Sequence, residues 1–139
     1  MDKIVASSVL DMYKTIFEDL TGQYVTRISL EHWSVRIMFV KCSELIVECD
    51  WRLTDESGNE MDNSVQLGIR KRFELWRIVG STATHFEIDP ENICAWSIQT
   101  SSGMKLTIIG DLDKFEDWSI VFPNHEGMFV SSGGQITKW

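Results

Sequence analysis

The chain carries one succession of segments twice, and this repeat constrains its fold more than any other feature of the sequence. Each copy has an aromatic residue, a glycine, a Trp-Ser pair followed by a β-branched residue, and an apolar triplet. The first copy reads Phe17-Glu18-Asp19-Leu20, Gly22, Ile28, Trp33-Ser34-Val35 and Leu45-Ile46-Val47, and the second reads Phe73-Glu74-Leu75-Trp76, Gly80, Phe86 or Ile88, Trp96-Ser97-Ile98 and Leu106-Thr107-Ile108. Such self-similarity is typical of a repeated supersecondary unit. We therefore expect a pseudo-repeat of about residues 9–53 and 70–110 within a single domain, 1–139.

The first copy begins with a helical pattern. Apolar residues recur at helical spacing on one stripe, namely Val9, Leu10, Tyr13, Ile16, Phe17 and Leu20. Ser7 or Ser8 is a suitable N-cap for this helix, and Gly22 supplies its end.

After Gly22 the apolar period changes from 3.6 residues to 2, which indicates half-buried strands. The alternating residues are Tyr24, Ile28 and Leu30, then Trp33, Val35, Ile37 and Phe39, then Leu45, Val47, Cys49 and Trp51. One such unit exposes an apolar face, and two units can cover each other or continue one curved sheet. We expect an α+β fold, mainly antiparallel β, with an N-terminal helix packed on a curved sheet built from two β-meander-like repeats. Strands within 117–139, including a hairpin turned at Ser132-Gly133-Gly134, complete it.

Two segments lie between the repeats. The stretch 55–64 is polar and lacks periodicity, which predicts an exposed loop. It does not fit a calcium-binding EF-hand loop, because Glu60 stands where glycine is needed and Gln66 where glutamate is needed. In the segment 64–80, Val65, Leu67 and Ile69 indicate a short strand, and Phe73, Trp76 and Val79 indicate one or two helical turns ending at Gly80.

Composition excludes several classes of function. The chain has 13 Lys and Arg against 21 Asp and Glu, a net charge of −8, which disfavours nucleic acid and anionic membranes as partners. It shows no apolar run long enough to span a bilayer and no signal peptide, so we expect a cytoplasmic protein. Cys42, Cys49 and Cys94 lack metal-site spacing, and we expect free buried thiols rather than a disulfide or zinc site.

Catalytic signatures are also missing from the sequence. His32, His85 and His125 are scattered, and no nucleophile motif such as GxSxG occurs. We expect no enzyme activity, no metal and no cofactor, although a convergence of His85, Cys94 and a carboxylate would favour an enzyme. The tryptophans of the Trp-Ser segments, a third of which is Trp118-Ser119-Ile120, stand in phase with aliphatic residues and are expected in the core.

The remaining candidates for function are acidic. Carboxylates lie on the outward face of the third strand of the first copy, at Glu44, Glu48 and Asp50, and they also occur throughout the stretch 55–64 and directly before Trp118. A solvated surface is the simplest interpretation, but together they would also attract a basic protein. The candidate contact residues are Asp50, Asp55, Glu56, Glu60, Asp62, Asp111, Asp113, Glu116 and Asp117.

The C-terminal half resembles a family of small bacterial domains. Phe115-Glu116-Asp117-Trp118, then Ser131-Ser132-Gly133-Gly134 and a final Trp139 are similar to C-termini that read aromatic-Glu-x-Trp, a strand, Gly-Gly and a last Trp. Gly80, Phe86 and Leu106-Thr107-Ile108 also fit, so the resemblance covers about residues 70–139.

Small acidic cytosolic proteins of this build resemble immunity proteins of contact-dependent growth inhibition and related polymorphic toxin systems. The resemblance implies that the chain binds a cognate toxin domain, commonly a nuclease with a cationic groove, and blocks its active site. It carries over no toxin-contacting residues. The alternative is a small-molecule-binding β domain with an aromatic-lined cavity.

Overall fold

The computed structural model describes residues 3–31, 34–66, 73–110, 117–124, 129–132 and 135–138. In chain order the elements are α1 (Lys3–Leu20), β1 (Val25–Leu30), β2 (Val35–Phe39), β3 (Glu44–Val47), β4 (Asp50–Thr54), β5 (Glu60–Asn63), the 3-10 helices η1 (Ser64–Gln66) and η2 (Leu75–Ile78), β6 (Ala83–Ile88), β7 (Ala95–Thr100), β8 (Lys105–Ile109), β9 (Trp118–Val121), β10 (Phe129–Ser132) and β11 (Gln135–Lys138). The predicted α+β class is confirmed. Among these residues no helix combines the length and the apolar character needed to cross a membrane.

Helix α1 buries the predicted apolar stripe. Val9, Tyr13, Ile16 and Leu20 are buried, whereas Leu10 is 51% exposed. The helix begins at Lys3, so Ser7 and Ser8 lie inside it and the N-cap prediction is wrong. Its end follows the prediction, because Gly22 has a φ of +83°, a conformation that glycine adopts without steric cost.

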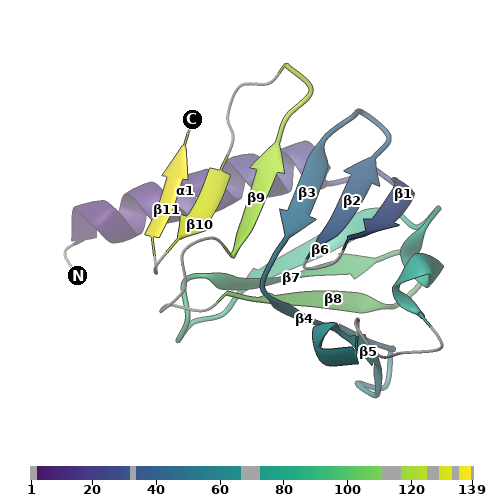
Figure 1. The fold of residues 1–139 in the computed structure, drawn as a ribbon. Helices are drawn as coiled ribbons and strands as arrows, with labels where there is room; N and C mark the ends of the chain where they lie inside the picture. The colour runs from purple at the N-terminus through teal and green to yellow at the C-terminus, as the bar shows by residue number, and fades with distance from the viewer. Residues whose placement is uncertain are drawn as a thin grey trace.

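The strands form two antiparallel sheets that exchange strands (Figure 1). Sheet 1 has the order β1-β2-β3-β9-β10-β11, and sheet 2 has the order β5-β4-β8-β7-β6. The two meanders, β1–β3 and β6–β8, lie in different sheets, and the strand that follows each meander crosses to the other sheet. Strand β4 pairs with β8, and β9 pairs with β3. The predicted C-terminal hairpin is the pair β10–β11.

The two sheets pack on a shared core, so the two meanders cover each other, and the expected single curved sheet built from both repeats is wrong in this respect. Phe39 of β2 and Ile98 of β7 line the same small internal space, together with Leu106 of β8. Helix α1 runs behind β9, β10 and β11 in Figure 1, where sheet 1 extends beyond sheet 2. Sheet 1 thus packs on sheet 2 over part of its inner face and on α1 over the rest, and Tyr13 of α1 contacts both Trp118 and Trp96.

The two copies of the repeat meet at their glycines in a reciprocal set of backbone hydrogen bonds. Gly22 N donates to Ala83 O (2.9 Å), and Gly80 N donates to Val25 O (2.7 Å). The same relation joins Val25 N to Ser81 O (3.0 Å) and Ala83 N to Gln23 O (2.9 Å). The two bonds of each pair are exchanged when the two copies of the repeat are exchanged. The two copies are therefore related by a local pseudo-two-fold axis between Gly22 and Gly80.

The strand registers extend this relation along both meanders. The pairs β1–β2 and β6–β7 each have a register shift after their first residue, at Thr26 and Thr84. Each of these threonines donates its hydroxyl to a carbonyl of the next strand, Met38 O at 3.2 Å and Gln99 O at 3.1 Å. The predicted matches of Gly22 with Gly80 and of Ile28 with Phe86 agree with this register.

The predicted match of the Trp-Ser segments is two residues out of register. Val35, which lies opposite Leu30 and Val47, corresponds to Trp96, which lies opposite Ile88 and Ile108. A shift of two residues keeps every side chain on its face, so the alternating pattern cannot detect it. Trp33 itself lies outside the described residues.

The third Trp-Ser segment belongs to a different position of the repeat. Trp118 of β9 lies opposite Val47, and Trp51 of β4 lies opposite Ile108. Val47 and Ile108 are equivalent residues of the two meanders, so Trp51 and Trp118 are equivalent too. Each is preceded by an aspartate, Asp50 or Asp117, at the start of a crossing strand.

The buried aromatic side chains contact one another in the core. The ring centroid of Trp96 lies 5.2 Å from that of Trp118 and 6.0 Å from that of Tyr13. Burial raises the pKa of Tyr13, whose hydroxyl donates to Ile93 O at 2.5 Å. The prediction of core positions is confirmed for Trp96 and Trp118. Trp51 is buried as well, Trp76 is 58% exposed, and Trp33 and Trp139 lie outside the described residues.

One turn of the repeat holds a non-glycine residue in a left-handed conformation. Cys42, between β2 and β3, has a φ of +73°, and its equivalent between β7 and β8 is Gly103, with a φ of +86°. Both donate their N–H to the last residue of the preceding strand, Cys42 to Phe39 O and Gly103 to Thr100 O. Cys42 is exposed, so the prediction of three buried thiols is wrong for this residue.

We therefore expect Cys42→Gly to raise the free energy of unfolding by about 1 kcal/mol. The substitution removes the steric cost of a side chain at positive φ, and this gain is larger than the entropic cost of ordering a glycine. Urea denaturation measures this change. The matched reverse substitution, Gly103→Ala, should destabilise the protein, since its new methyl group would also collide with Glu56. A loss of stability in Cys42→Gly would contradict the strain at this turn.

Candidate functional site

The structure separates the nine predicted acidic residues into exposed and buried groups. Asp50, Glu56 and Glu60 are exposed, and Asp55 is partly exposed. Asp62 and Asp117 are buried, with exposed fractions of 4% and 0%. The other predicted contact residues, Asp111, Asp113 and Glu116, lie outside the described residues.

Asp62 is a structural residue, not a surface contact. Its carboxylate accepts hydrogen bonds from the backbone N–H groups of Glu74 (2.9 Å), Leu75 (2.8 Å) and Asn63 (2.8 Å). These bonds tie β5 to the beginning of η2, where backbone donors have no partner within the helix. The prediction that 55–64 is one exposed loop is wrong for its second half, since 60–63 form β5 and pair with β4.

Asp117 is buried directly before β9, where the chain crosses from sheet 2 to sheet 1. Its carbonyl oxygen accepts a hydrogen bond from Glu48 N at 2.8 Å, which joins the two crossing connections. A side chain with no exposed surface cannot contact a partner protein. Asp117 is therefore not part of a contact surface.

The exposed part of the acidic stretch is a tight turn. The Asp55 carboxylate accepts hydrogen bonds from the N–H groups of Ser57 and Asn59, both at 2.9 Å. The hydrogen bond from Asn59 N is the main cause that lowers the pKa of Asp55. The Glu56 side chain lies against Gly103 in the turn between β7 and β8. Asp55 thus holds the turn at 55–59 in place, whereas Glu56 is exposed and lies beside the neighbouring turn.

A second acidic region gathers where the two crossing connections meet, and we call it the crossover end. It comprises the exposed residues Glu48 and Asp50, before and at the start of β4, and Asp89 and Glu91, after β6. The segments converge because Ile109 of β8 pairs with Asp50 on one side and with Ala95 on the other. The hydrogen bond from Asn92 Nδ2 to Gly110 O (2.9 Å) holds the β6–β7 loop there.

Sequence reasoning assigned Asp50 to a candidate surface but not Asp89 and Glu91. Their signal is the Asp89-Pro90-Glu91 turn, in which Asp89 Oδ1 accepts the N–H of Glu91 at 2.8 Å. Turns of this kind are recognisable from sequence. That Asp89 and Glu91 lie at the same end of sheet 2 as Asp50 is not recognisable from sequence, because it depends on the pairing of both β4 and β7 with β8.

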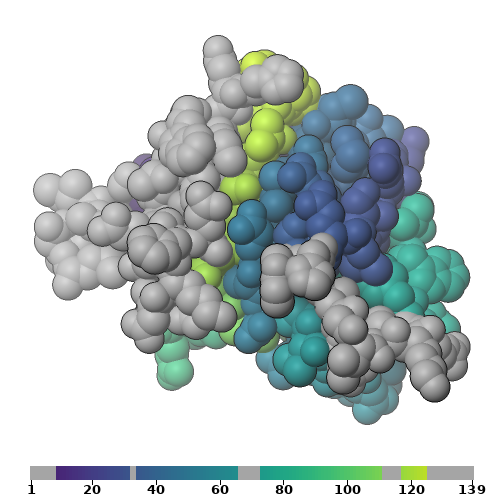
Figure 2. Space-filling model, viewed as in Figure 1, coloured from purple at the N-terminus to yellow at the C-terminus, as the bar shows by residue number. Residues whose placement is uncertain are grey.

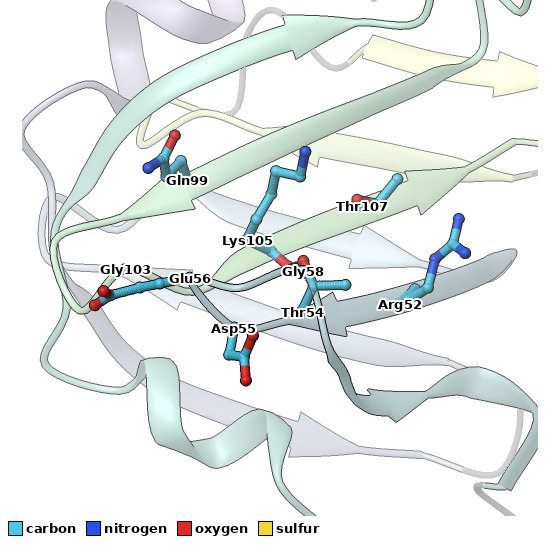
Figure 3. A pocket seen from close by; sticks show the side chains of 9 residues that line it. All are labelled: Arg52, Thr54, Asp55, Glu56, Gly58, Gln99, Gly103, Lys105 and Thr107. Atoms are coloured by element: carbon cyan, nitrogen blue, oxygen red, sulfur yellow. Dashed lines mark hydrogen bonds between the residues drawn. The ribbon is translucent and has the colours of Figure 1, made fainter.

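The outer face of sheet 2 carries a polar groove (Figure 3). Its volume is about 620 Å³, and its lining residues come from β4, β7, β8 and the two turns beside them. They are Arg52, Thr54, Asp55, Glu56, Gly58, Gln99, Gly103, Lys105 and Thr107. In Figure 3 the side chains of Arg52 and Lys105 extend to the same side with Thr107 between them, whereas Asp55 points away. Sequence reasoning missed this groove.

The expected aromatic cavity does not coincide with this groove. The lining of the polar groove includes no aromatic residue, and the buried Trp96 and Trp118 contact each other and Tyr13 in the core. The small internal space between the sheets is lined by aliphatic residues, Ala83, Thr100 and the one aromatic side chain of Phe39.

The groups that sequence reasoning considered for catalysis lie apart. His85 is exposed on β6, where its Nδ1 lies 3.2 Å from Thr84 Oγ1, and Cys94 is fully buried before β7. His85 lies opposite Gln99, near the far end of β7 from Cys94. Within the described residues, no group of three or more His, Cys, Asp or Glu side chains is placed to hold a metal ion. His32 and His125 lie outside those residues.

Neither a protein-family model, nor a curated protein, nor a solved structure matches this chain.

Proposed function

We propose that this protein is an immunity protein, which binds a basic toxin domain, of the nuclease class, in the cytoplasm and blocks its substrate groove. The observation that carries this proposal is the location of the acidic excess. Among the described side chains, every carboxylate except Asp62 and Asp117 is exposed or partly exposed. Within the described residues, nearly all carboxylates therefore lie where a partner protein can reach them.

Two cations, Arg36 and Arg77, form close ion pairs with carboxylates of the protein itself. Arg36 on the outer face of sheet 1 is held between Glu31 (2.6 Å) and Glu44 (2.9 Å). Figure 2 shows this side, where the segments of β1–β3 form a continuous surface. Arg77 lies 2.7 Å from Glu74 in η2. Such pairs reduce the positive potential that a partner meets at these places.

The crossover end is the best candidate contact region on this acidic surface. The backbone of this region is held by hydrogen bonds: Asp50 pairs with Ile109, Glu48 N donates to Asp117 O and Asp89 N donates to Ala95 O. Fixed negative groups can occupy positions that phosphates take in a cationic nuclease groove. They also speed the encounter with a basic partner by about one to three orders of magnitude at low salt. Asp55, Glu56 and Glu60 add to the same field.

Charge reversal at the crossover end tests this proposal. We expect Glu48→Lys with Asp50→Lys to slow association with the proposed cognate toxin domain by about 10- to 100-fold at low salt. Stopped-flow or surface-based kinetics at several salt concentrations measure this effect. The difference from the unsubstituted protein should shrink as salt rises, because screening weakens long-range attraction.

The matched control places the same charge change on the exposed face of α1, as Asp11→Lys with Glu18→Lys. This variant changes the net charge equally but leaves the crossover end intact, so its association rate should fall much less. Equal losses in the two variants would show that net charge alone acts. A rate that does not depend on salt would contradict electrostatic docking altogether.

A further inference from the structure

The polar groove on sheet 2 brings two cations together on an otherwise acidic protein. Arg52 lies directly opposite Thr107, and Thr54 lies directly opposite Lys105, in the pairing of β4 with β8. Arg52 and Lys105 are therefore diagonal neighbours on one face, and such positions are about 7–8 Å apart. An anion that binds between these two side chains would be attracted by both positive charges.

The carboxylates around these cations leave them largely available. Lys105 Nζ lies within 4 Å of no carboxylate oxygen in the described part of the chain. Arg52 Nε approaches Glu60 only to 3.9 Å, and both side chains are about half exposed, so this pair contributes little. The Asp55 carboxylate is directed into its own turn, and Glu56 lies against Gly103, on the far side of the groove from Arg52 (Figure 3).

The rest of the lining supplies hydrogen-bonding groups. Thr107 stands between the two cations, and Gln99 lies opposite Lys105 in the pairing of β7 with β8. Thr54 Oγ1 makes only a long bond, 3.4 Å, to Lys105 O. Hydroxyl and amide donors beside two cations are the groups that recognise phosphate and carboxylate oxygens. The volume of about 620 Å³ lies within the range of about 300–1,000 Å³ that is typical of small-molecule sites.

We propose that the groove binds a small polar anion, whose phosphate or carboxylate group lies between Arg52 and Lys105. The ammonium and guanidinium groups contribute charge-assisted hydrogen bonds, and Thr107 adds a neutral one. The lack of aromatic lining favours a hydrophilic ligand over a flat aromatic one. Binding of the anion needs no partner protein, and the groove lies next to the crossover end, since Asp50 and Arg52 are two residues apart on the same exposed face of β4.

Thermal denaturation with defined anions tests the proposal. Pyrophosphate is the phosphate probe and citrate is the carboxylate probe, each compared with sodium chloride of equal ionic strength. At about ten times its Kd, the preferred anion should raise Tm by about 3–5 °C. Amide chemical shift changes should be confined to β4, β7 and β8.

Variants locate the site. Lys105→Ala and Arg52→Ala should each weaken binding by about tenfold or more, and the double variant should abolish the Tm rise. Lys41→Ala and Arg27→Ala remove exposed cations elsewhere and should leave the rise unchanged. No rise beyond that of sodium chloride with either anion would overturn the proposal. So would a rise that survives in the double variant.

Discussion

Replacing Trp118 by alanine should lower the free energy of unfolding by about 4 kcal/mol. The indole is 1% exposed and packs against the rings of Tyr13 and Trp96, so the substitution leaves a large cavity between α1 and both sheets. It also removes the hydrogen bond from Trp118 Nε1 to Cys94 O, at 3.1 Å, and leaves a buried carbonyl without that donor. Urea denaturation followed by circular dichroism measures the change.

Trp76→Ala is the matched control for this prediction. Trp76 is 58% exposed on η2, so the same substitution should cost well under half as much. Trp118→Phe should lie between the two, because a phenyl ring fills part of the cavity but cannot donate to Cys94 O. Equal losses for Trp76→Ala and Trp118→Ala would contradict the packing of the core.

The second large effect is expected for Asp62→Ala, at about 3 kcal/mol. The substitution leaves the N–H groups of Glu74 and Leu75 without their acceptor in a buried position, and frees the beginning of η2 from β5. Asp62→Asn keeps one oxygen acceptor of the same shape and should recover part of this loss. Differential scanning calorimetry on the unsubstituted protein, Asp62→Asn and Asp62→Ala should show stability decreasing in that order.

The comparison with Asp55 separates a structural carboxylate from a surface one. Asp55 also accepts backbone hydrogen bonds, but at an exposed turn where water can replace it. Asp55→Ala should therefore destabilise the protein far less than Asp62→Ala. If the two variants lost the same stability, the assignment of Asp62 to the core would be wrong.

Local features of the fold were predictable from the sequence. Helix α1 follows from a stripe of apolar residues at helical spacing, and Gly22 and Gly80 mark the points where the chain turns into β1 and β6. The meanders follow from alternation with a period of two. Each of these patterns is set by neighbours in the chain, so one sequence suffices to recognise it.

The exchange of strands between the sheets was not predictable in this way. The residues of β4 do not indicate that it pairs with β8, and the residues of β9 do not indicate that it pairs with β3. The same limitation explains why the sequence predicted Asp62 and Asp117 to be surface residues. Asp62 is buried where β5 pairs with β4, and Asp117 is buried where the chain crosses from sheet 2 to β9 of sheet 1. This limitation also explains the groove, whose cations Arg52 and Lys105 come from distant segments and meet only through the sheet.

Co-expression with the product of the neighbouring reading frame, the candidate toxin, tests the central claim most directly. We expect the two proteins to co-purify as a stoichiometric complex and cells making this protein to survive the toxin. The charge reversal at Glu48 and Asp50 should reduce protection, and the reversal at Asp11 and Glu18 should reduce it much less. Toxin that kills cells regardless of this protein, together with a failure to co-purify, would contradict the immunity function.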